Sequence, residues 1–300
     1  MRYEVWHDEY KGDDKVNEYW HGLWFVPEKY NRTIISSLQA IRDEHGVDYS
    51  ASVKFAGCLK KPATSRLISN QLQLFSHSLI RKPEMAETPL INQDQGNKFR
   101  QELDYYYKLN SPWFCKFVLL KIPDNHANMN TLIPDYADRV ETTYRWALKG
   151  GLHFLLKDQP VEIVAFHFDG DQHHGRPISK DNITRGPFRG NITFSKDLRI
   201  CSYHKKNRPT GENMMLCLVD NALGAIASNI NGVTKIGDAT YPLEEIMKRA
   251  WSGTLNKQVN SRWYKSINFS QAEIINGEIR FFDIFKKIAD VKQGELSFFL

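Results

Sequence analysis

The segment WFCKFVLLKI, residues 113–122, is an apolar run between two prolines, and VEIVAFHFD, residues 161–169, is a second apolar run. Runs of this kind are typical of strands that are buried on both faces of a sheet. Between them, YADRVETTYRWALKGGLHFLL at 136–156 has apolar residues at helical spacing, including Tyr144 and Leu148. A strand, a helix and a strand in this order predict an α/β layer architecture.

The N-terminal segment predicts an antiparallel hairpin. Residues 2–8 (RYEVWHD) alternate, with Tyr3, Val5 and His7 on one face, which is the period of a strand. Residues 19–26 (YWHGLWFV) are aromatic and β-branched and end at a proline. Because a hairpin is antiparallel and the later strands alternate with helices, we expect a mixed sheet flanked by helices.

The remaining segments predict a large domain and an extension. We expect helices at 28–45, closed by Gly46, and at 212–230, strands at 47–58 and 198–206, and a helical insertion at about 60–111. Asn276-Gly277 between alternating runs at 272–284 predicts a hairpin, since both residues tolerate positive φ. The predicted main domain covers residues 1–240, and residues 241–300 form a helix and a hairpin packed on it.

The composition is that of an ordinary globular protein with a small excess of basic residues. The chain has 300 residues, 41% of them hydrophobic, and a formal net charge of +5. That length suffices for one large core, and the charge permits nucleic-acid binding without arguing for it. The cysteines form no CxxC pair, and Cys58, Cys115 and Cys217 lie in apolar runs. We therefore expect neither a disulfide framework nor a zinc site built on thiols.

No targeting or membrane segment is visible in the sequence. The N-terminus, MRYEVWHDEY, is charged from the start and lacks the apolar region of a signal peptide. No run reaches the ~18 apolar residues that a transmembrane helix needs. We therefore expect a cytoplasmic protein without a membrane partner.

Asp220 interrupts a strongly apolar helical segment, which reads LCLVDNALGA. Leu216, Val219, Leu223 and Ile226 make this segment a core helix. A carboxylate beside such a face loses hydration free energy unless it is paired or binds a cation. We favour a metal-binding role; the alternative is an aspartate at the edge of the apolar stripe, solvated or paired with a lysine.

Other acids lie at the ends of predicted strands. Asp8 and Glu9 lie at the end of the first strand, Asp169 ends its apolar strand, and Asp171 comes two residues later. Because sites in open α/β sheets lie at the carboxyl ends of strands, we expect Asp8, Asp169 and Asp220 to converge. Such carboxylates suit Mg²⁺ or Mn²⁺, and two ions about 4 Å apart would activate water and stabilise the leaving oxygen in phosphodiester hydrolysis. For Asp8 or Asp169 alone, a turn-capping role is equally plausible.

The run HFDGDQHHG raises the question of a metal bound by His167, His173 and His174. Its spacing matches no metal-binding motif with a defensible geometry, so solvated histidines are the favoured interpretation. His167 lies two residues before Asp169 and therefore shares its strand face.

The basic segment 176–208 interleaves lysine and arginine with Phe188 and Phe194, and its glycines favour a flexible loop. Such a loop beside a metal site suits a phosphodiester backbone, and a solvent-facing charged loop is the equal alternative. The residues that we expect to bind nucleic acid are Lys54, Arg185, Arg189, Lys205 and Lys206.

The order of these motifs resembles the family called domain of unknown function 3800, a ribonuclease H-like group. The resemblance rests on Trp6-His7-Asp8-Glu9, WHGLWFVP at 20–27, VEIVAFHFD and LCLVDNALGA, in the family's order over residues 1 to about 230. It implies a ribonuclease H-like sheet, metal-dependent nuclease chemistry and an acidic site at Asp8, Glu9, Asp169 and Asp220.

Two departures accompany the resemblance. Tyr10-Lys11 replaces the family's Ser-Gly, and Ser52-Val53-Lys54 replaces a Glu-x-Lys on the third strand, so the lysine is present and the glutamate is not. Two functions are therefore alternatives. The first is a Mg²⁺- or Mn²⁺-dependent nuclease or phosphodiesterase; the second is a catalytically inactive module that binds nucleic acid or a protein partner. The C-terminal extension is a candidate interface for such a partner or for a second copy of the chain.

Overall fold

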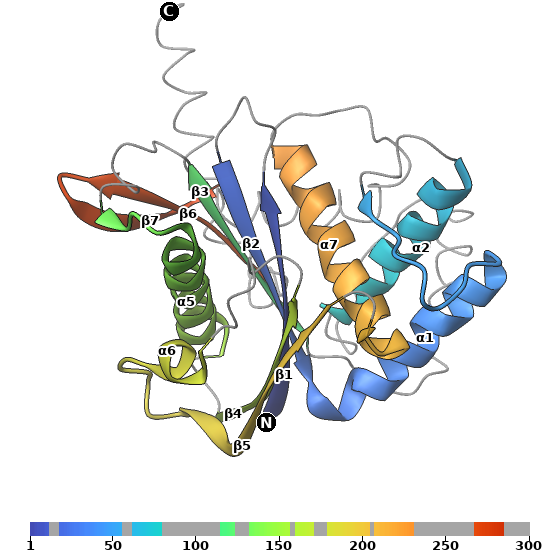
Figure 1. The fold of residues 1–300 in the computed structure, drawn as a ribbon, viewed down its shortest axis with the longest axis horizontal. Helices are drawn as coiled ribbons and strands as arrows, with labels where there is room; N and C mark the ends of the chain where they lie inside the picture. Colours follow the sequence, from blue (N-terminus) through green and yellow to red (C-terminus); the bar gives the residue numbers. More distant parts are fainter. Residues whose placement is uncertain are drawn as a thin grey trace, which may run out of the picture.

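One mixed sheet forms the centre of the protein in this computed structural model (Figure 1). The residues that the structure describes are 1–11, 18–55, 62–79, 115–123, 132–156, 160–170, 179–204, 207–230 and 267–284. The strands are β1 (Arg2–Lys11), β2 (Glu18–Pro27), β3 (Lys116–Pro123), β4 (Val161–Asp169), β5 (Ile192–Tyr203), β6 (Ile267–Ile275) and β7 (Glu278–Asp283). Their order across the sheet is β5-β4-β1-β2-β3-β6-β7. The expected α/β class with a mixed sheet is confirmed.

The first three strands form an antiparallel meander, with β1 beside β2 and β2 beside β3. β4 pairs with β1 in parallel, and β5 extends the sheet in parallel with β4. At the other edge, β6 runs parallel to β3 and turns back into β7. Because β1 and β4 are parallel neighbours, the carboxyl ends of these two strands lie together at one end of the strands.

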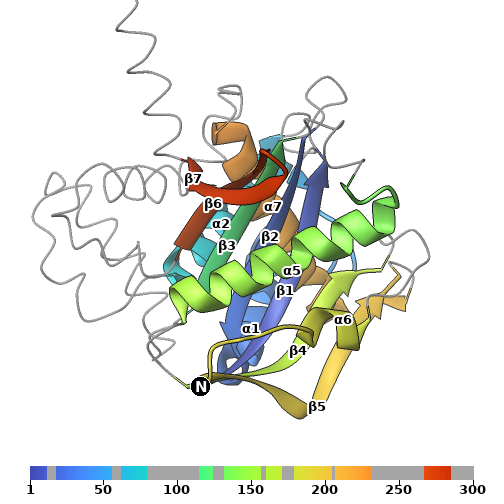
Figure 2. The same cartoon turned by 90° about the vertical axis from the view of Figure 1, so that its left-hand side faces the viewer.

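Helices cover both faces of the sheet (Figures 1 and 2). α1 (Asn31–Glu44), α2 (Pro62–Ser78) and α7 (Thr210–Ile230) lie on one face, and α5 (Tyr136–Leu155) and α6 (Lys180–Thr184) lie on the other. A short 3-10 helix, Glu28–Tyr30, leads from β2 into α1. Two apolar cores result, one between the sheet and α1, α2 and α7, the other between the sheet and α5. We call the two sides of the sheet the α7 face and the α5 face.

The alternation of the first strand directs its side chains to these two faces. Tyr3 and Val5 belong to the core on the α5 face, whereas Trp6 belongs to the core on the α7 face. His7 also lies on the α5 face, where its ring contacts Tyr144. Successive side chains of a strand point to opposite faces, so Asp8 shares the α7 face with Trp6.

The long helices expected around residues 28–45, 136–156 and 212–230 are confirmed as α1, α5 and α7. Gly151 lets α5 approach the sheet closely, because a Cβ there would lie 2.3 Å from Cγ2 of Val118. α2 confirms the first part of the helical insertion, and the rest of the insertion lies outside the described residues, as does the short helix of the extension. None of the helices in the described part of the chain combines the length and apolarity of a membrane span.

The strand expected at 47–58 is wrong for the residues that the structure describes. Residues 47–55 form turns and extended chain outside the sheet, and 56–58 are not among the described residues. The pattern alternates because Val53 and Phe55 point into the helical core, not because the segment pairs with a strand. Side chains hold its carbonyl groups instead: Arg42 donates to Asp48, Tyr49 and Ala51, Asn213 to Ser50 and Ala51, and Asn221 to Val53.

The basic segment 176–208 is not one flexible loop. Its described part contains α6 and β5, and β5 begins six residues before the strand expected at 198–206. The pairing of β4 with β5 is irregular between Ile163 and Ala165, which breaks the alternation that a regular strand would display.

The C-terminal hairpin expected at 272–284 is confirmed. Asn276 and Gly277 connect β6 to β7 with φ values of 53° and 78°. Both values lie in the left-handed region that a tight hairpin turn requires. The hairpin extends the central sheet through the pairing of β6 with β3.

Candidate acidic site at the carboxyl ends of β1 and β4

Asp8 and Asp169 lie on neighbouring parallel strands on the α7 face of the sheet, Asp169 at the end of β4 and Asp8 three residues before the end of β1. The register pairs Trp6 with His167, and each aspartate lies two residues further along its strand. Asp8 is 3% exposed and Asp169 is 6% exposed. Because a buried carboxyl group needs a proton or a partner, the two residues mark a polar site inside a largely apolar layer.

The third carboxyl group comes from α7, which packs on β1 and β4. The carboxyl groups of Asp220 and Asp8 lie close enough together for each to alter the pKa of the other. The Oδ2 atom of Asp220 is buried and has no hydrogen-bond partner among the described residues. Asp220 therefore carries a buried acceptor that a proton or a cation would satisfy.

Burial and mutual repulsion disfavour the ionised forms of these acids. Burial, followed by the charges of Asp220 and Asp169, raises the pKa of Asp8 well above its ordinary value. Burial and the charge of Asp169 raise the pKa of Glu9 to about 7. Burial also raises the pKa of Asp220, although the charge of Lys54 opposes the rise. The site thus favours a proton or another positive charge among its carboxyl groups.

The extended chain that ends at Phe55 supplies a lysine and a backbone donor. The Phe55 N–H donates to the carboxyl group of Asp220. The exposed Lys54 is close enough to Asp8 and Asp220 for its charge to oppose the rise in both pKa values. Gly224 makes room for this chain, because a Cβ there would lie 2.8 Å from Cδ1 of Phe55. The structure therefore places Lys54 at the acidic site.

Arg208, in the connection between β5 and α7, binds Asp169. Its Nη2 atom lies 2.6 Å from Oδ1 of Asp169, and the two side chains are 3% and 8% exposed. A charge pair at this depth is costly to break, because the remaining partner would stay buried without compensation. In the sequence, Arg208 is one of many basic residues in an expected surface loop, and no local pattern distinguishes it.

Arg185 and Arg189 lie away from the acidic site. They are exposed between α6 and β5 on the α5 face, where the Arg189 N–H donates to His153 of α5. The Arg189 carbonyl accepts from the first residue of β5, so both arginines adjoin the starts of the strands, whereas the acids lie at the ends. The length of a strand such as β4, about 25 Å, separates the two places. Asp171, Lys205 and Lys206, like His173 and His174, lie outside the described residues.

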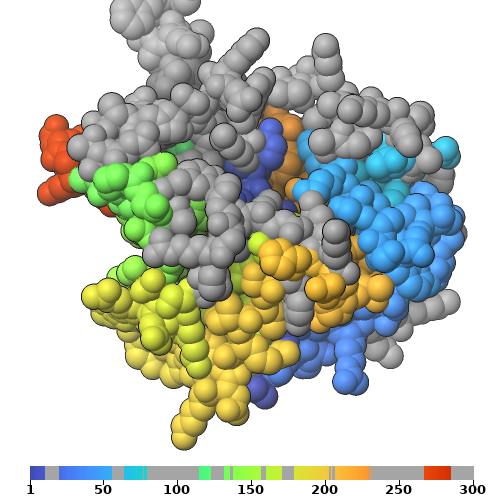
Figure 3. Space-filling view, viewed as in Figure 1, coloured from blue at the N-terminus to red at the C-terminus, as the bar shows by residue number. Residues whose placement is uncertain are grey.

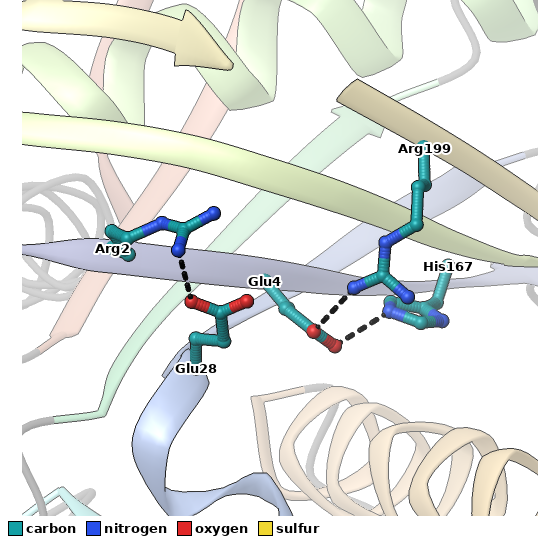
Figure 4. Close-up of polar contacts among 5 residues, drawn as sticks. All are labelled: Arg2, Glu4, Glu28, His167 and Arg199. Atoms are coloured by element: carbon teal, nitrogen blue, oxygen red, sulfur yellow. Dashed lines mark hydrogen bonds and ion pairs between the residues drawn. The ribbon is translucent and has the colours of Figure 1, made fainter. Parts of the chain in front are cut away.

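His167 is buried in a charged network, so the expectation of a solvated histidine is wrong for this residue (Figure 4). Its Nε2 atom lies 2.8 Å from Oε2 of Glu4, and Nη2 of Arg199 lies 2.8 Å from Oε1 of the same carboxylate. Burial acts to raise the pKa of Glu4, but the bonds and charges of His167 and Arg199 outweigh it and lower that pKa. The ring of Trp6 stacks on His167 at 3.7 Å between centroids.

The donor set of the acidic site suits a hard divalent cation. Asp8, Asp169 and Asp220 offer oxygen ligands, the type that Mg²⁺ and Mn²⁺ prefer, and the unsatisfied Oδ2 of Asp220 fits such an ion. Glu9 follows Asp8 in β1, so its side chain leaves the strand on the opposite, α5 face, where the register pairs it with His21. Within the part of the chain that the structure describes, no three acidic, histidine or cysteine side chains are arranged to hold a metal ion as they stand.

No protein-family model matches the chain, and no curated protein matches it either. The function must therefore be argued from the chemistry of the site.

Proposed function

We propose that the protein is a divalent-metal-dependent nuclease or phosphodiesterase that hydrolyses phosphodiester bonds of nucleic acid at the acidic site. The observation that carries the proposal is the convergence of Asp8, Asp169 and Asp220, from two strands and a helix, close enough for the charges of Asp220 and Asp169 to raise the pKa of Asp8. One buried carboxylate with a partner is common in a stable fold. Several mutually repelling acids in one place cost desolvation free energy, and such arrangements are characteristic of functional sites.

The strand arrangement supports a ribonuclease H-like core for this proposal. An antiparallel meander of three strands is followed by two parallel strands on the β1 side of the sheet. The acids lie at the ends of β1 and β4 and on α7, the elements whose motifs carry the family resemblance. The β6–β7 hairpin is an addition beside β3, at the edge far from the acids.

In this proposal Asp8 and Asp220 hold the metal ion, Mg²⁺ or Mn²⁺. When bound, the ion supplies activation of the attacking water and neutralises charge on the leaving oxygen. Asp169 has a different role, because its Oδ1 atom forms an ion pair with Arg208. It holds that guanidinium beside the carboxyl groups.

Lys54 and Arg208 supply the positive charge that a phosphodiester substrate needs. Lys54 is exposed next to Asp8 and Asp220, so its ammonium group can contact a phosphate oxygen from the solvent side. Arg208 is buried, so it acts on the site through its charge. A substrate therefore approaches the acids from the side of Lys54.

The second candidate function is a catalytically inactive module that binds nucleic acid or a protein partner. Two observations favour it. Ser52 stands where the resembled family has a glutamate, and Arg208 already brings positive charge to the acids. In such a module the carboxyl groups serve to hold Arg208 and Lys54 in place.

Metal binding and hydrolysis distinguish the two functions. The nuclease proposal expects saturable Mn²⁺ binding by titration calorimetry, Mn²⁺-dependent cleavage of labelled DNA or RNA oligonucleotides, and loss of both in Asp220→Asn. Glu278→Gln is the matched control, because this side chain is 74% exposed on β7, and it should bind and cleave like the wild type. Oligonucleotide binding without Mn²⁺ binding or cleavage would establish the inactive module, and the absence of all three would reject both functions.

A further inference from the structure

A second group of reactive side chains lies next to the acidic site. It belongs to the row of residues, paired across the strands, that lies two positions before Asp8 and Asp169. The register places Trp6, His167 and Cys201 side by side on β1, β4 and β5. Glu4 and Arg199 belong to the next row, towards the starts of the strands. Side chains of residues paired across parallel strands point to the same face, so the Cys201 thiol lies beside the His167 ring.

Its neighbours hold His167 in one orientation (Figure 4). Nε2 lies 2.8 Å from the Glu4 carboxylate, and the Trp6 ring covers one face with an interplanar angle of 7°. Because Nε2 donates to the carboxylate, Nδ1 is the basic atom of the neutral ring, and it has no hydrogen-bond partner among the residues described. Arg199 binds the other oxygen of Glu4 and keeps that carboxylate in place.

Cys201 differs from Cys115 and Cys217, which are buried, because it is partly exposed on the edge strand β5. The segment that contains β5, in yellow, forms part of the molecular surface in Figure 3. A partly exposed cysteine beside a base that a carboxylate orients is the arrangement that activates cysteine as a nucleophile.

We propose that Cys201 is a reactive thiol that forms mixed disulfides with low-molecular-weight disulfides, with His167 as its base and Glu4 as the residue that positions the base. The inference is independent of the nuclease proposal, because it requires neither a metal ion nor Asp8 or Asp220.

In the reaction, the proton of the Cys201 thiol passes to Nδ1 of His167, and the thiolate attacks one sulfur of the small disulfide. A new S–S bond forms to Cys201 while the original S–S bond breaks. The departing thiolate leaves with the bonding electron pair and takes the proton from His167. Cys201 is oxidised, one half of the small disulfide is reduced to a free thiol, and Glu4 stays ionised throughout.

The experiment measures reaction rates of individual thiols at neutral pH, with peptide mass mapping to identify the residue. Every protein carries Cys58→Ser, because residue 58 lies outside the described part of the chain, and the buried Cys115 and Cys217 are internal references. We expect iodoacetamide to alkylate Cys201 about tenfold faster than it alkylates N-acetylcysteine. We also expect glutathione disulfide to add one glutathionyl group to Cys201. Cys201→Ser should abolish both reactions.

Variants of the two supporting residues test their roles. His167→Gln keeps an amide that can donate to Glu4 but removes the base, and it should slow alkylation about tenfold. His167→Ala should be equally slow, and added imidazole should accelerate this variant without accelerating the wild type. Glu4→Gln should lower the rate less than either change at His167. Glu28→Gln is the matched control, because Glu28 forms an ion pair with Arg2 at the surface, and it should react like the wild type.

Circular dichroism establishes which variants are folded, and the rates of folded proteins decide the proposal. A folded His167→Gln protein that reacts as fast as the wild type would overturn it. So would an alanine variant that imidazole does not accelerate, or alkylation of Cys115 or Cys217 in preference to Cys201.

Discussion

The carboxyl groups of Asp8 and Asp220 lie side by side, although Asp8 belongs to the first strand and Asp220 to α7, more than 200 residues later in the sequence. Each alters the pKa of the other, so their protonation is coupled and a change at either residue affects both. Asp169 adds further negative charge to the same place. Substitutions at and around this pair therefore have measurable consequences for stability and for the response to metal.

Asp220→Asn should abolish metal-dependent hydrolysis and leave the fold intact. Asparagine keeps the size of the side chain and an oxygen that accepts from the Phe55 N–H, but it removes a repelling charge. The melting temperature in EDTA should stay level or rise by about 2–4 °C, as a gain near 1 kcal/mol produces. The increase that Mn²⁺ causes should shrink. Thermal shift of both proteins with EDTA and with Mn²⁺ measures this, and a destabilised variant with an unchanged Mn²⁺ response would remove Asp220 from the metal site.

Arg208→Gln should destabilise the metal-free protein by about 3–5 kcal/mol, because it leaves the Asp169 carboxylate buried without its charged partner. Mn²⁺ should restore part of the loss, since it supplies positive charge to the same acids. Urea unfolding with and without Mn²⁺ measures both effects. Arg280→Gln is the control, because Arg280 is 55% exposed on β7, and it should change stability by less than about 0.5 kcal/mol. A large loss that Mn²⁺ does not reduce would contradict metal binding at the acids.

Gly224→Ala should displace the chain around Phe55. This shift should move Lys54 away from the acidic site. The new Cβ would lie 2.8 Å from the Phe55 ring, and overpacking of this kind costs about 1–3 kcal/mol. Gly150→Ala on α5 is the matched helix control, because a Cβ there meets nothing within 4 Å, and it should gain about 0.5–1 kcal/mol. Urea unfolding and oligonucleotide affinity measure the two effects. Equal stability of the two alanine variants would refute the close packing of Phe55 on α7.

The metal-free protein should lose stability as the pH rises from about 5 to 8. The folded state raises the pKa of Glu9 from 4.5 to about 7 and raises that of Asp8, so the folded protein holds protons that the unfolded chain releases. A raised carboxyl pKa stabilises the fold below the unfolded value, and this contribution disappears as the pH passes the folded value. For Glu9 it amounts to at most about 3 kcal/mol.

Urea unfolding in EDTA at several pH values measures this slope. Glu9→Gln should flatten it, because the neutral amide cannot titrate, whereas Glu278→Gln on the exposed hairpin should leave it unchanged. A slope of the opposite sign, or one that Glu9→Gln does not alter, would show that Glu9 does not titrate in this way.

The sequence predicted the long elements because their signals are local. The spacing of Tyr144 and Leu148 predicted α5, and Asn276-Gly277 predicted the turn between β6 and β7. The prediction was wrong at residues 47–55, where alternation of Val53 and Phe55 reflects packing under helices. It also missed the first half of β5, because the irregular pairing with β4 interrupts the strand pattern.

The sequence by itself therefore determined the α/β class and most helices and strands, and it made Asp8, Asp169 and Asp220 candidate site residues. It could do so because periodicity, turn residues and a charge within an apolar run are all properties of neighbouring residues. Only the tertiary structure decided that Asp8 and Asp220 lie side by side, that Arg208 is buried on Asp169, that Arg185 and Arg189 lie on the other face, and that Glu4 orients His167 beside Cys201. These relations join residues from separate strands and helices, and burial, pairing and pKa follow from contacts that no short stretch of chain contains.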